Sequence, residues 1–249
     1  MPFTGWRLAR PSLPLVAATA AAFVTLCGLG AWQLDRLAWK TAQIALREAR
    51  LTAPAVTLAE ALGDPAGTEF RPIRLSGRYL HGAEALVGME RFGGTVGPIQ
   101  ATPLQVTDGP IVIVDRGLIP VHSKEPARRP HSRIDAPVQL QGHVRLPPKA
   151  GLFASPNDPA RAYWYRIDPA AQLAHARLQG VASLYVQAVP DPASDATLPV
   201  ARPVAAQLSN PHLGYVVTWF GLAAALACVF LAFHLRRPAG ALRAQESRT

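Results

Sequence analysis

Two long stretches without charged residues, one near each end of the chain, limit its folding options most strongly. Residues 11–34 contain no charge, and residues 215–234 contain none apart from the ionisable His234. About twenty helical residues, at about 1.5 Å each, cross the ~30 Å hydrocarbon core of a bilayer. The sequence therefore predicts two transmembrane helices, at residues 13–34 and 211–235.

The first stretch has a second interpretation, as a cleaved signal peptide with Arg7 and Arg10 in its basic region. Its apolar run is longer than the roughly 7 to 15 residues of such signals. The residues that follow, 32–36, read WQLDR and lack the small residues of a cleavage site. These features favour an uncleaved membrane anchor.

Basic residues beside the two stretches predict the orientation of the chain. Cytoplasmic loops next to transmembrane helices are enriched in Lys and Arg. Two arginines precede the first stretch and three follow the second: Arg7, Arg10, Arg236, Arg237 and Arg243. Residues 1–12 and 236–249 are therefore predicted to be cytoplasmic, with residues 35–210 on the outer side. Arg36 and Lys40 weaken this contrast, although long loops are translocated with little regard to charge.

The positive charge and the cysteines argue against two classes of function. The formal net charge is +9, and more than half of it belongs to the two ends of the chain. There it reports membrane topology, so nucleic-acid binding is not indicated. Both cysteines, Cys27 and Cys228, lie within predicted spans. The outer segment therefore has no disulfide and no thiolate site, which disfavours a role in copper delivery.

The segment between the two spans has mostly strand patterns. The first helix is predicted to continue to about residue 50, because no Gly or Pro occurs from residue 31 to 53. Short helices are predicted at 58–62 and 169–178. Strands are predicted at 70–80, 85–90, 99–106, 111–117, 138–146, 163–167 and 181–189.

The connections predict how these strands pair. Residues 81–84 would join the first two strands, and the Asp-Gly turn at 108–109 would join the next two. Residues 93–98 and 122–137 resemble loops, and residues 191–208 an extended return to the membrane. We expect an α+β membrane protein in which two transmembrane helices flank an antiparallel β-rich outer domain. So many strands should curl into a small barrel or sandwich.

His212 is the residue whose position most suggests chemistry. Asn210 is a favoured N-cap and Pro211 suits the first helical position, which puts His212 in the first turn. The positive end of the helix dipole favours a neutral ring there, and a neutral ring can ligate a metal such as haem iron. Tyr215 and Trp219 fall on the same helical face. The alternative is an interfacial histidine beside an aromatic belt.

Other candidate residues have structural interpretations beside functional ones. Arg36 and Lys40 either reach lipid phosphates or form a cationic shelf for an anionic ligand or partner. The run 115–117, Asp-Arg-Gly, ends a core strand, where a structural ion pair and a turn glycine explain it better than binding does. The sequence has no nucleophile elbow, HxxxH pair, paired cysteines or phosphate loop, so it does not indicate an enzyme.

Three segments, taken together, resemble a known family. They are GAWQLDRLAWK at residues 30–40, VDRGLIP at 114–120, and NPHLGY followed by TWFGLA within 210–223. They are similar to the three signatures of the surfeit locus protein 1 family and occur in the same order. Leu118 replaces the tryptophan usual in the middle signature, and Pro211 stands where a second asparagine is often found.

The resemblance implies an assembly factor for cytochrome c oxidase, a multi-pass protein of the bacterial inner membrane with a periplasmic central domain. It implies help in the delivery or insertion of haem a into oxidase subunit I, with haem a synthase as a second partner. By this resemblance His212 is the axial ligand of the haem iron. Tyr215 and Trp219 would pack the macrocycle, and Arg36 or Lys40 would meet its propionates.

Two other functions stay open at this point. One is a scaffold that stabilises an oxidase assembly intermediate without binding haem, for which the His212 face would be packed on protein. The other is a membrane-anchored hydrolase or transferase, which predicts a pocket joining a nucleophile with a perturbed acid or base.

Overall fold

The computed structural model describes residues 7–8, 11–149, 151, 154–190, 198–204 and 210–236, with only the backbone at 7, 8, 181, 235 and 236. The chain forms two compact units. The helical unit comprises Met1–Ile44 and Leu208–Thr249, and the sheet unit comprises Ala45–Gln207. Arg10, Arg237, Arg243 and parts of the 191–208 segment, all used in the sequence predictions, lie outside the described residues.

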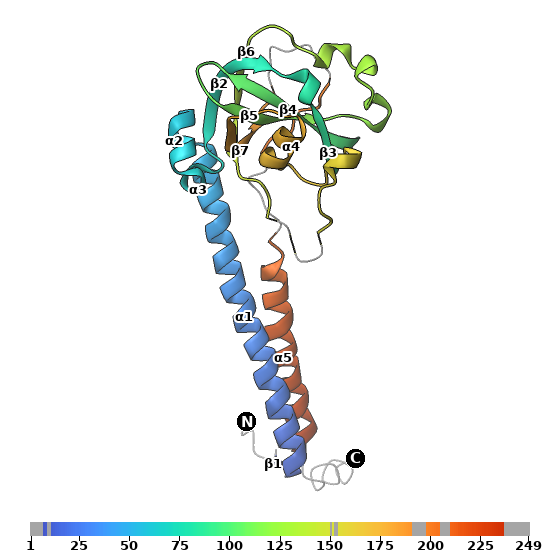
Figure 1. Ribbon diagram of the computed structural model, residues 1–249. Coiled ribbons are helices and arrows are strands. Elements are labelled where there is room, and N and C mark those ends of the chain that lie inside the picture. Colours follow the sequence, from blue (N-terminus) through green and yellow to red (C-terminus); the bar gives the residue numbers. More distant parts are fainter. Residues whose placement is uncertain are drawn as a thin grey trace, which may run out of the picture. The chain divides into compact units, whose positions relative to one another are not determined.

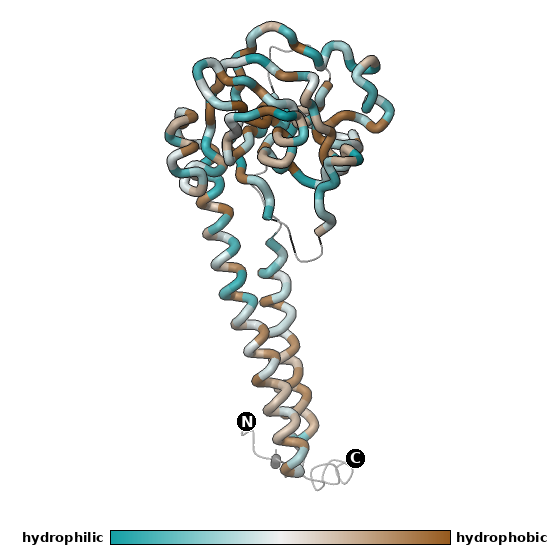
Figure 2. The backbone as a smooth tube through the Cα atoms, viewed as in Figure 1, coloured by the Kyte–Doolittle hydropathy of each residue, from teal (hydrophilic) through white to brown (hydrophobic). Residues whose placement is uncertain are grey.

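Two long helices, α1 (Leu13–Leu51) and α5 (His212–His234), make up most of the helical unit. Both are long and apolar enough to cross a membrane. Figure 2 shows hydrophobic residues along most of α5 and along the first half of α1, whereas the later part of α1 carries many polar residues. The prediction of one helix that continues past residue 34 to about residue 50 is confirmed.

The two helices lie side by side and run in opposite directions (Figure 1). Gly30 and Gln33 of α1 are buried, as are Val216 and Ala223 of α5, at the spacings that place residues on one helical face. A Cβ on Gly30 would lie 2.8 Å from the Phe220 ring, so the glycine allows close packing. The backbones of β1 (Arg7–Leu8) and β8 (Leu235–Arg236) form a short antiparallel pair.

The sheet unit contains one six-stranded sheet in the order β2-β6-β7-β5-β4-β3. The β5–β7 pair is parallel and the other neighbours are antiparallel, so the sheet is mixed. β2 also pairs with β4 over a short stretch. The strands are β2 (Pro72–Tyr79), β3 (Ala85–Phe92), β4 (Thr95–Val106), β5 (Ile111–Leu118), β6 (Val138–Arg145) and β7 (Val181–Ala188).

Short helices connect the strands. Thr57 and Glu60 form a capping box at the start of α2, and Asp168 caps α4 by accepting a hydrogen bond from the Ala171 N–H at 3.1 Å. The α-helices are α2 (Leu58–Gly63), α3 (Pro65–Thr68) and α4 (Pro169–His175). The 3₁₀ helices are η1 (His81–Ala83), η2 (Val121–Ser123), η3 (Pro126–Arg128), η4 (Pro130–Ser132) and η5 (Pro159–Arg161).

One of the two predicted hairpins is correct. β4 and β5 pair across Asp108, whose φ of +55° suits the turn. β3 pairs with β4 and not with β2, so the predicted hairpin across 81–84 is wrong. The predicted loop at 93–98 is shorter than expected, because β4 already begins at Thr95. The turn itself consists of Gly93 and Gly94, with φ of +56° and +81°. Two consecutive positive φ values match the tight hairpin turns that twisted strands favour.

The sheet is not a barrel, which corrects the expected fold. All eight residues of β5 are buried, so both faces of that strand need cover, whereas a small barrel buries one face. Val112 and Val114 pack in one apolar cluster with Ala61 of α2, while Ile111 and Ile113 pack in a second one, which includes Leu173 of α4. The described part of the sheet unit contains this single sheet, so two stacked sheets are not present there either.

The predicted loop at 122–137 consists largely of 3₁₀ turns, and a buried ion pair joins it to Glu84. Arg129 Nη2 lies 2.5 Å from Glu84 Oε1, and the two side chains are 3% and 13% exposed. Breaking a pair buried to this extent leaves an uncompensated charge, which costs several kcal/mol. The loop is therefore attached to the start of β3.

Asp115, in the second half of β5, holds the segment that precedes α5 in the chain. Its carboxylate accepts hydrogen bonds from the Gly117 N–H at 3.0 Å and from Arg202 Nη2 at 2.7 Å, and Arg202 also pairs with Glu90. Burial raises the pKa of the Asp115 carboxyl above its usual range, and the Arg202 charge opposes that shift. The predicted ion pair exists, but its cation comes from residue 202.

Gly30→Val should weaken the α1–α5 contact, because the new side chain meets the Phe220 ring. We expect a loss of about 1–3 kcal/mol, the usual cost of overpacking, measured as a lower thermal unfolding midpoint of the full chain in detergent. Gly28→Val is the matched control, since nothing lies within 4 Å of a Cβ at Gly28. Equal losses in the two variants would contradict the contact.

Arg202→Met should destabilise the protein by about 3–5 kcal/mol, because it leaves the Asp115 carboxylate buried without its cation. The raised folded-state pKa means that the folded chain binds a proton more tightly than the unfolded chain. Stability should therefore fall as the pH rises from about 4 through that raised pKa, and the variant should show the larger fall.

Denaturant unfolding of the variant at pH 5 and pH 8 measures both effects. Arg133→Met is the control, because Arg133 and its partner Asp135 are 67% and 71% exposed and exposed pairs contribute at most about 1 kcal/mol. A loss in Arg202→Met no greater than in Arg133→Met would show that the buried pair does not hold this segment.

Candidate functional site

His212, the first residue of α5, forms a hydrogen bond with α1. Its ring is half-buried, and Nδ1 lies 2.7 Å from Oε1 of Gln33. An amide oxygen can only accept, so Nδ1 carries a proton, and in the neutral ring Nε2 then keeps its lone pair. No hydrogen bond to Nε2 occurs among the described residues. This tautomer is the one that a ligand histidine has when a neighbouring oxygen orients its other nitrogen.

Gln33 is a site residue that the sequence predictions missed. The sequence places it with Arg36 on the polar side of the helical extension, but its side chain is buried, with 8% of the residue exposed. A signal for it was present. Gln33 is the one amide side chain in the uncharged 11–34 stretch, and strongly polar groups at membrane depth usually have a partner or a function.

The side chains of Trp219 and Tyr215 differ in their exposure. Trp219 is half-buried on the same side of α5 as the buried Val216, and its indole Nε1 has no hydrogen-bond partner within the described part of the chain. Tyr215 is 52% exposed. His212 and Trp219 therefore lie on the side of α5 that contacts α1. Tyr215 lies at the solvent-exposed margin of the same helical face.

Arg36 and Lys40 both lie one or two turns from Gln33 along α1. The Arg36 guanidinium is exposed and lies 5.8 Å from the ring centroids of both Trp32 and Trp39, which favours a cation–π interaction with each. Lys40 is half-buried. Seven residues separate it from Gln33, so it shares the side of α1 that faces α5. Arg36 and Lys40 thus lie within two helical turns of Gln33, the partner of His212.

Asn210 does not cap α5, which corrects the predicted helix start. Its Nδ2 donates to Thr41 Oγ1 at 3.4 Å, across to α1, and its buried Oδ1 accepts no hydrogen bond from any described residue. The side chain has turned toward α1, away from the N–H groups of its own helix. His212 is therefore held by Gln33 and by the helix it starts.

This arrangement suits a metal that brings its own ligands. The described residues contain no group of three His, Cys, Asp or Glu side chains that could hold a bare ion. A metal that already has most of its coordination positions filled needs only one or two protein ligands. His212 Nε2 offers one, with an aromatic surface at Trp219 and positive charge at Arg36 and Lys40.

Comparisons with known proteins agree on one family. A family model described as the SURF1 family matches residues 20–224. Surfeit locus protein 1 of Homo sapiens is 32% identical over 237 residues, covering 87% of this chain and 76% of the human protein. SURF1-like protein of Drosophila melanogaster is 34% identical, covering 81% and 71%. SURF1-like protein of Monosiga brevicollis is 29% identical, covering 87% and 85%. The chain belongs to the SURF1 family.

Proposed function

We propose that this protein is a membrane-anchored assembly factor for cytochrome c oxidase that holds haem a through His212 and assists its delivery or insertion into subunit I. The SURF1 family is known in general for oxidase assembly factors. The observation that supports the haem-binding part most strongly is the hydrogen bond from His212 Nδ1 to Gln33 Oε1. It leaves Nε2 free to ligate iron.

The residues present fit a haem. The macrocycle supplies four nitrogen ligands to its iron, so a single protein imidazole can complete the binding. Trp219 contributes apolar surface, and Tyr215 contributes the exposed edge of the same helical face. Arg36 and Lys40 are the cations that would pair with carboxylate substituents of the macrocycle. The haem supplies the iron, and the chain positions it.

Holding the haem through one histidine suits a protein that must give it up. Transfer to subunit I requires only that the oxidase binds the haem more tightly than this chain does. A second protein ligand on the iron would make that step harder. We propose that the protein acts in this way without catalysing a reaction, and that haem a synthase is the partner that supplies the haem.

We also propose an orientation in the bacterial inner membrane. Residues 13–34 and 211–235 span the bilayer, the two termini lie in the cytoplasm, and the domain of residues 35–210 lies in the periplasm. The length and hydropathy of α1 and α5 support the spans. The arginines near both ends of the chain support the orientation.

A second candidate function is a scaffold that binds no haem. The bond between His212 and Gln33 favours it to some extent, because the same bond joins α1 to α5 and would stabilise the helix pair in apolar surroundings. The two functions differ in what Nε2 does. Only the haem-binding function requires its lone pair.

His212→Ala should abolish the haem absorption of the purified full chain in detergent, because it removes the ligand nitrogen. His234→Ala is the matched control, since His234 also lies at an end of α5 and its Nδ1 contacts the Phe230 carbonyl. The control should keep the spectrum. Unchanged haem binding in His212→Ala would exclude this residue as the ligand and leave the scaffold function.

Gln33→Leu should weaken haem binding by about ten- to hundredfold, the usual effect of losing the group that orients a ligand histidine. Gln33→Glu should restore most of the affinity, because a carboxylate also accepts the Nδ1 proton. Haem titration followed by absorbance measures both variants. If Gln33→Leu matched the wild type, the oriented-imidazole model would fail even with His212 as the ligand.

A further inference from the structure

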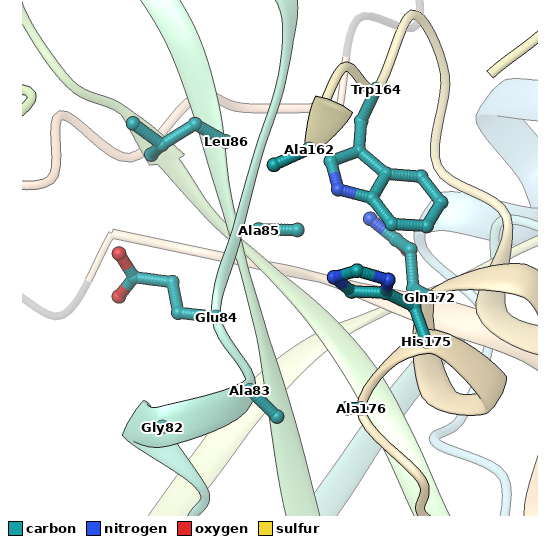
Figure 3. A pocket seen from close by; sticks show the side chains of 10 residues that line it. All are labelled: Gly82, Ala83, Glu84, Ala85, Leu86, Ala162, Trp164, Gln172, His175 and Ala176. Atoms are coloured by element: carbon teal, nitrogen blue, oxygen red, sulfur yellow. The ribbon is translucent and has the colours of Figure 1, made fainter. Parts of the chain in front are cut away.

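The sheet unit contains a cavity of about 430 Å³ that the proposed function does not use. It lies between the edge strand β3 and the helix α4, as Figure 3 shows. Ala85 and Leu86 of β3 line one side, and Trp164, Gln172, His175 and Ala176 line the other. Its volume falls in the range of sites that bind small organic molecules.

Gln172, one of the residues that line this cavity, has an unused hydrogen-bond donor. The residue is 3% exposed, and its Oε1 accepts from the Asp168 N–H at 3.3 Å. Its Nε2 is buried and has no partner among the described residues. In Figure 3 the amide lies between the rings of Trp164 and His175, with its nitrogen directed toward Ala85. Leaving such a donor unsatisfied is unfavourable, and a ligand acceptor would satisfy it.

The backbone of β3 offers a second donor. β3 is the edge strand, and the Gly88 N–H points away from β4 to donate to the Trp164 carbonyl at 2.7 Å. Residues two apart in a strand point their N–H groups in the same direction. The Leu86 N–H therefore also points away from β4, and Leu86 lines the cavity.

The rest of the lining selects a neutral, flat ligand. The Trp164 and His175 rings stand edge to face, with centroids 5.8 Å apart, and offer aromatic surface. The charged lining residue is Glu84, whose carboxylate points away from the cavity in Figure 3 and is bound by Arg129. The lining contains no Lys or Arg, so an anion has no permanent counter-charge there.

We propose that this cavity binds a neutral planar amide. Its carbonyl oxygen accepts hydrogen bonds from Gln172 Nε2 and the Leu86 N–H, and its flat body packs against Trp164 and His175. The amide is either a free small molecule or part of an extended peptide beside Leu86 of β3. Both sources share the same chemistry, and the probes below distinguish them.

The test measures binding to the full chain in detergent by ligand-observed saturation-transfer NMR. Benzamide is the small-amide probe, benzoate its anionic analogue, and N-acetyl-Ala-Phe-Ala-amide the peptide probe. We expect benzamide to bind at least tenfold more tightly than benzoate. Tighter binding of the tripeptide than of benzamide identifies a peptide site, and the reverse order identifies a small-molecule site.

Gln172→Leu should weaken benzamide binding about tenfold, because the change keeps the volume and removes the donor. The variant loses the bond from the Asp168 N–H to Gln172 Oε1, but α4 keeps the cap in which the Asp168 carboxylate accepts from the Ala171 N–H. Gln105→Leu is the matched control, since it removes an amide that bonds the Gly109 carbonyl, away from the cavity, and binding should not change. Partition of the probe into detergent is the same for every variant and cancels in the comparison.

Ala176→Phe provides a second variant that leaves Gln172 intact and fills the cavity, so benzamide binding should be lost in a chain with wild-type circular dichroism. Three results would overturn the proposal: no binding of either amide at 10 mM (roughly the weakest affinity expected of a fragment this size), equal binding of benzoate and benzamide, or unchanged binding in Gln172→Leu. None of them bears on haem binding at His212.

Discussion

A polar side chain between two apolar helices has to find its hydrogen-bond partner within the protein, and this constraint determines the geometry around His212. Gln33 lies in the uncharged part of α1 and is buried, so its amide oxygen needs a donor from the neighbouring helix. His212 Nδ1 provides it at 2.7 Å. The bond fixes the position of the imidazole and its tautomer at the same time, and the proposed ligation through Nε2 follows from that tautomer.

The sheet unit meets a similar requirement with charges. Asp115 is 2% exposed and lies within a strand that is buried along its whole length. Its two oxygens are satisfied by the Gly117 N–H and by Arg202, so the segment of residues 198–204 is tied to the sheet. Gly117 allows this, because a Cβ there would overlap the Val200 carbonyl. Both units thus use buried polar pairs to join segments far apart in the sequence.

Local patterns in the sequence predicted most of the elements but not how they pair. The long helix, the Asp-Gly hairpin and the buried 111–114 strand depend on neighbouring residues, and all three are confirmed. The β3–β4 pairing depends on recognising Gly93-Gly94 as a tight turn, and the parallel β5–β7 pair joins strands separated by β6 and α4. Sequence periodicity carries little information about such distant pairings.

Sequence periodicity was equally limited for the candidate site around His212, where contacts between distant residues matter. His212, Trp219, Arg36 and Lys40 are predicted site residues because each belongs to a helix end or an interfacial pattern. Gln33 was missed as a partner because helix periodicity alone does not say which residue of α5 meets which residue of α1. The Asp115 ion pair was expected, but its cation, Arg202, lies 87 positions away. Residues that act through another residue need the tertiary structure to be recognised.

The protonation state of the His212 ring tests the proposed ligation through Nε2 most directly. In the full chain labelled with ¹⁵N-histidine and free of haem, ¹⁵N NMR distinguishes a protonated ring nitrogen from one that carries a lone pair. We expect His212 to carry its proton on Nδ1 in the haem-free chain and haem to shift the Nε2 resonance. A proton on Nε2 in the haem-free chain would contradict that ligation, because the proposed ligand atom would already be occupied.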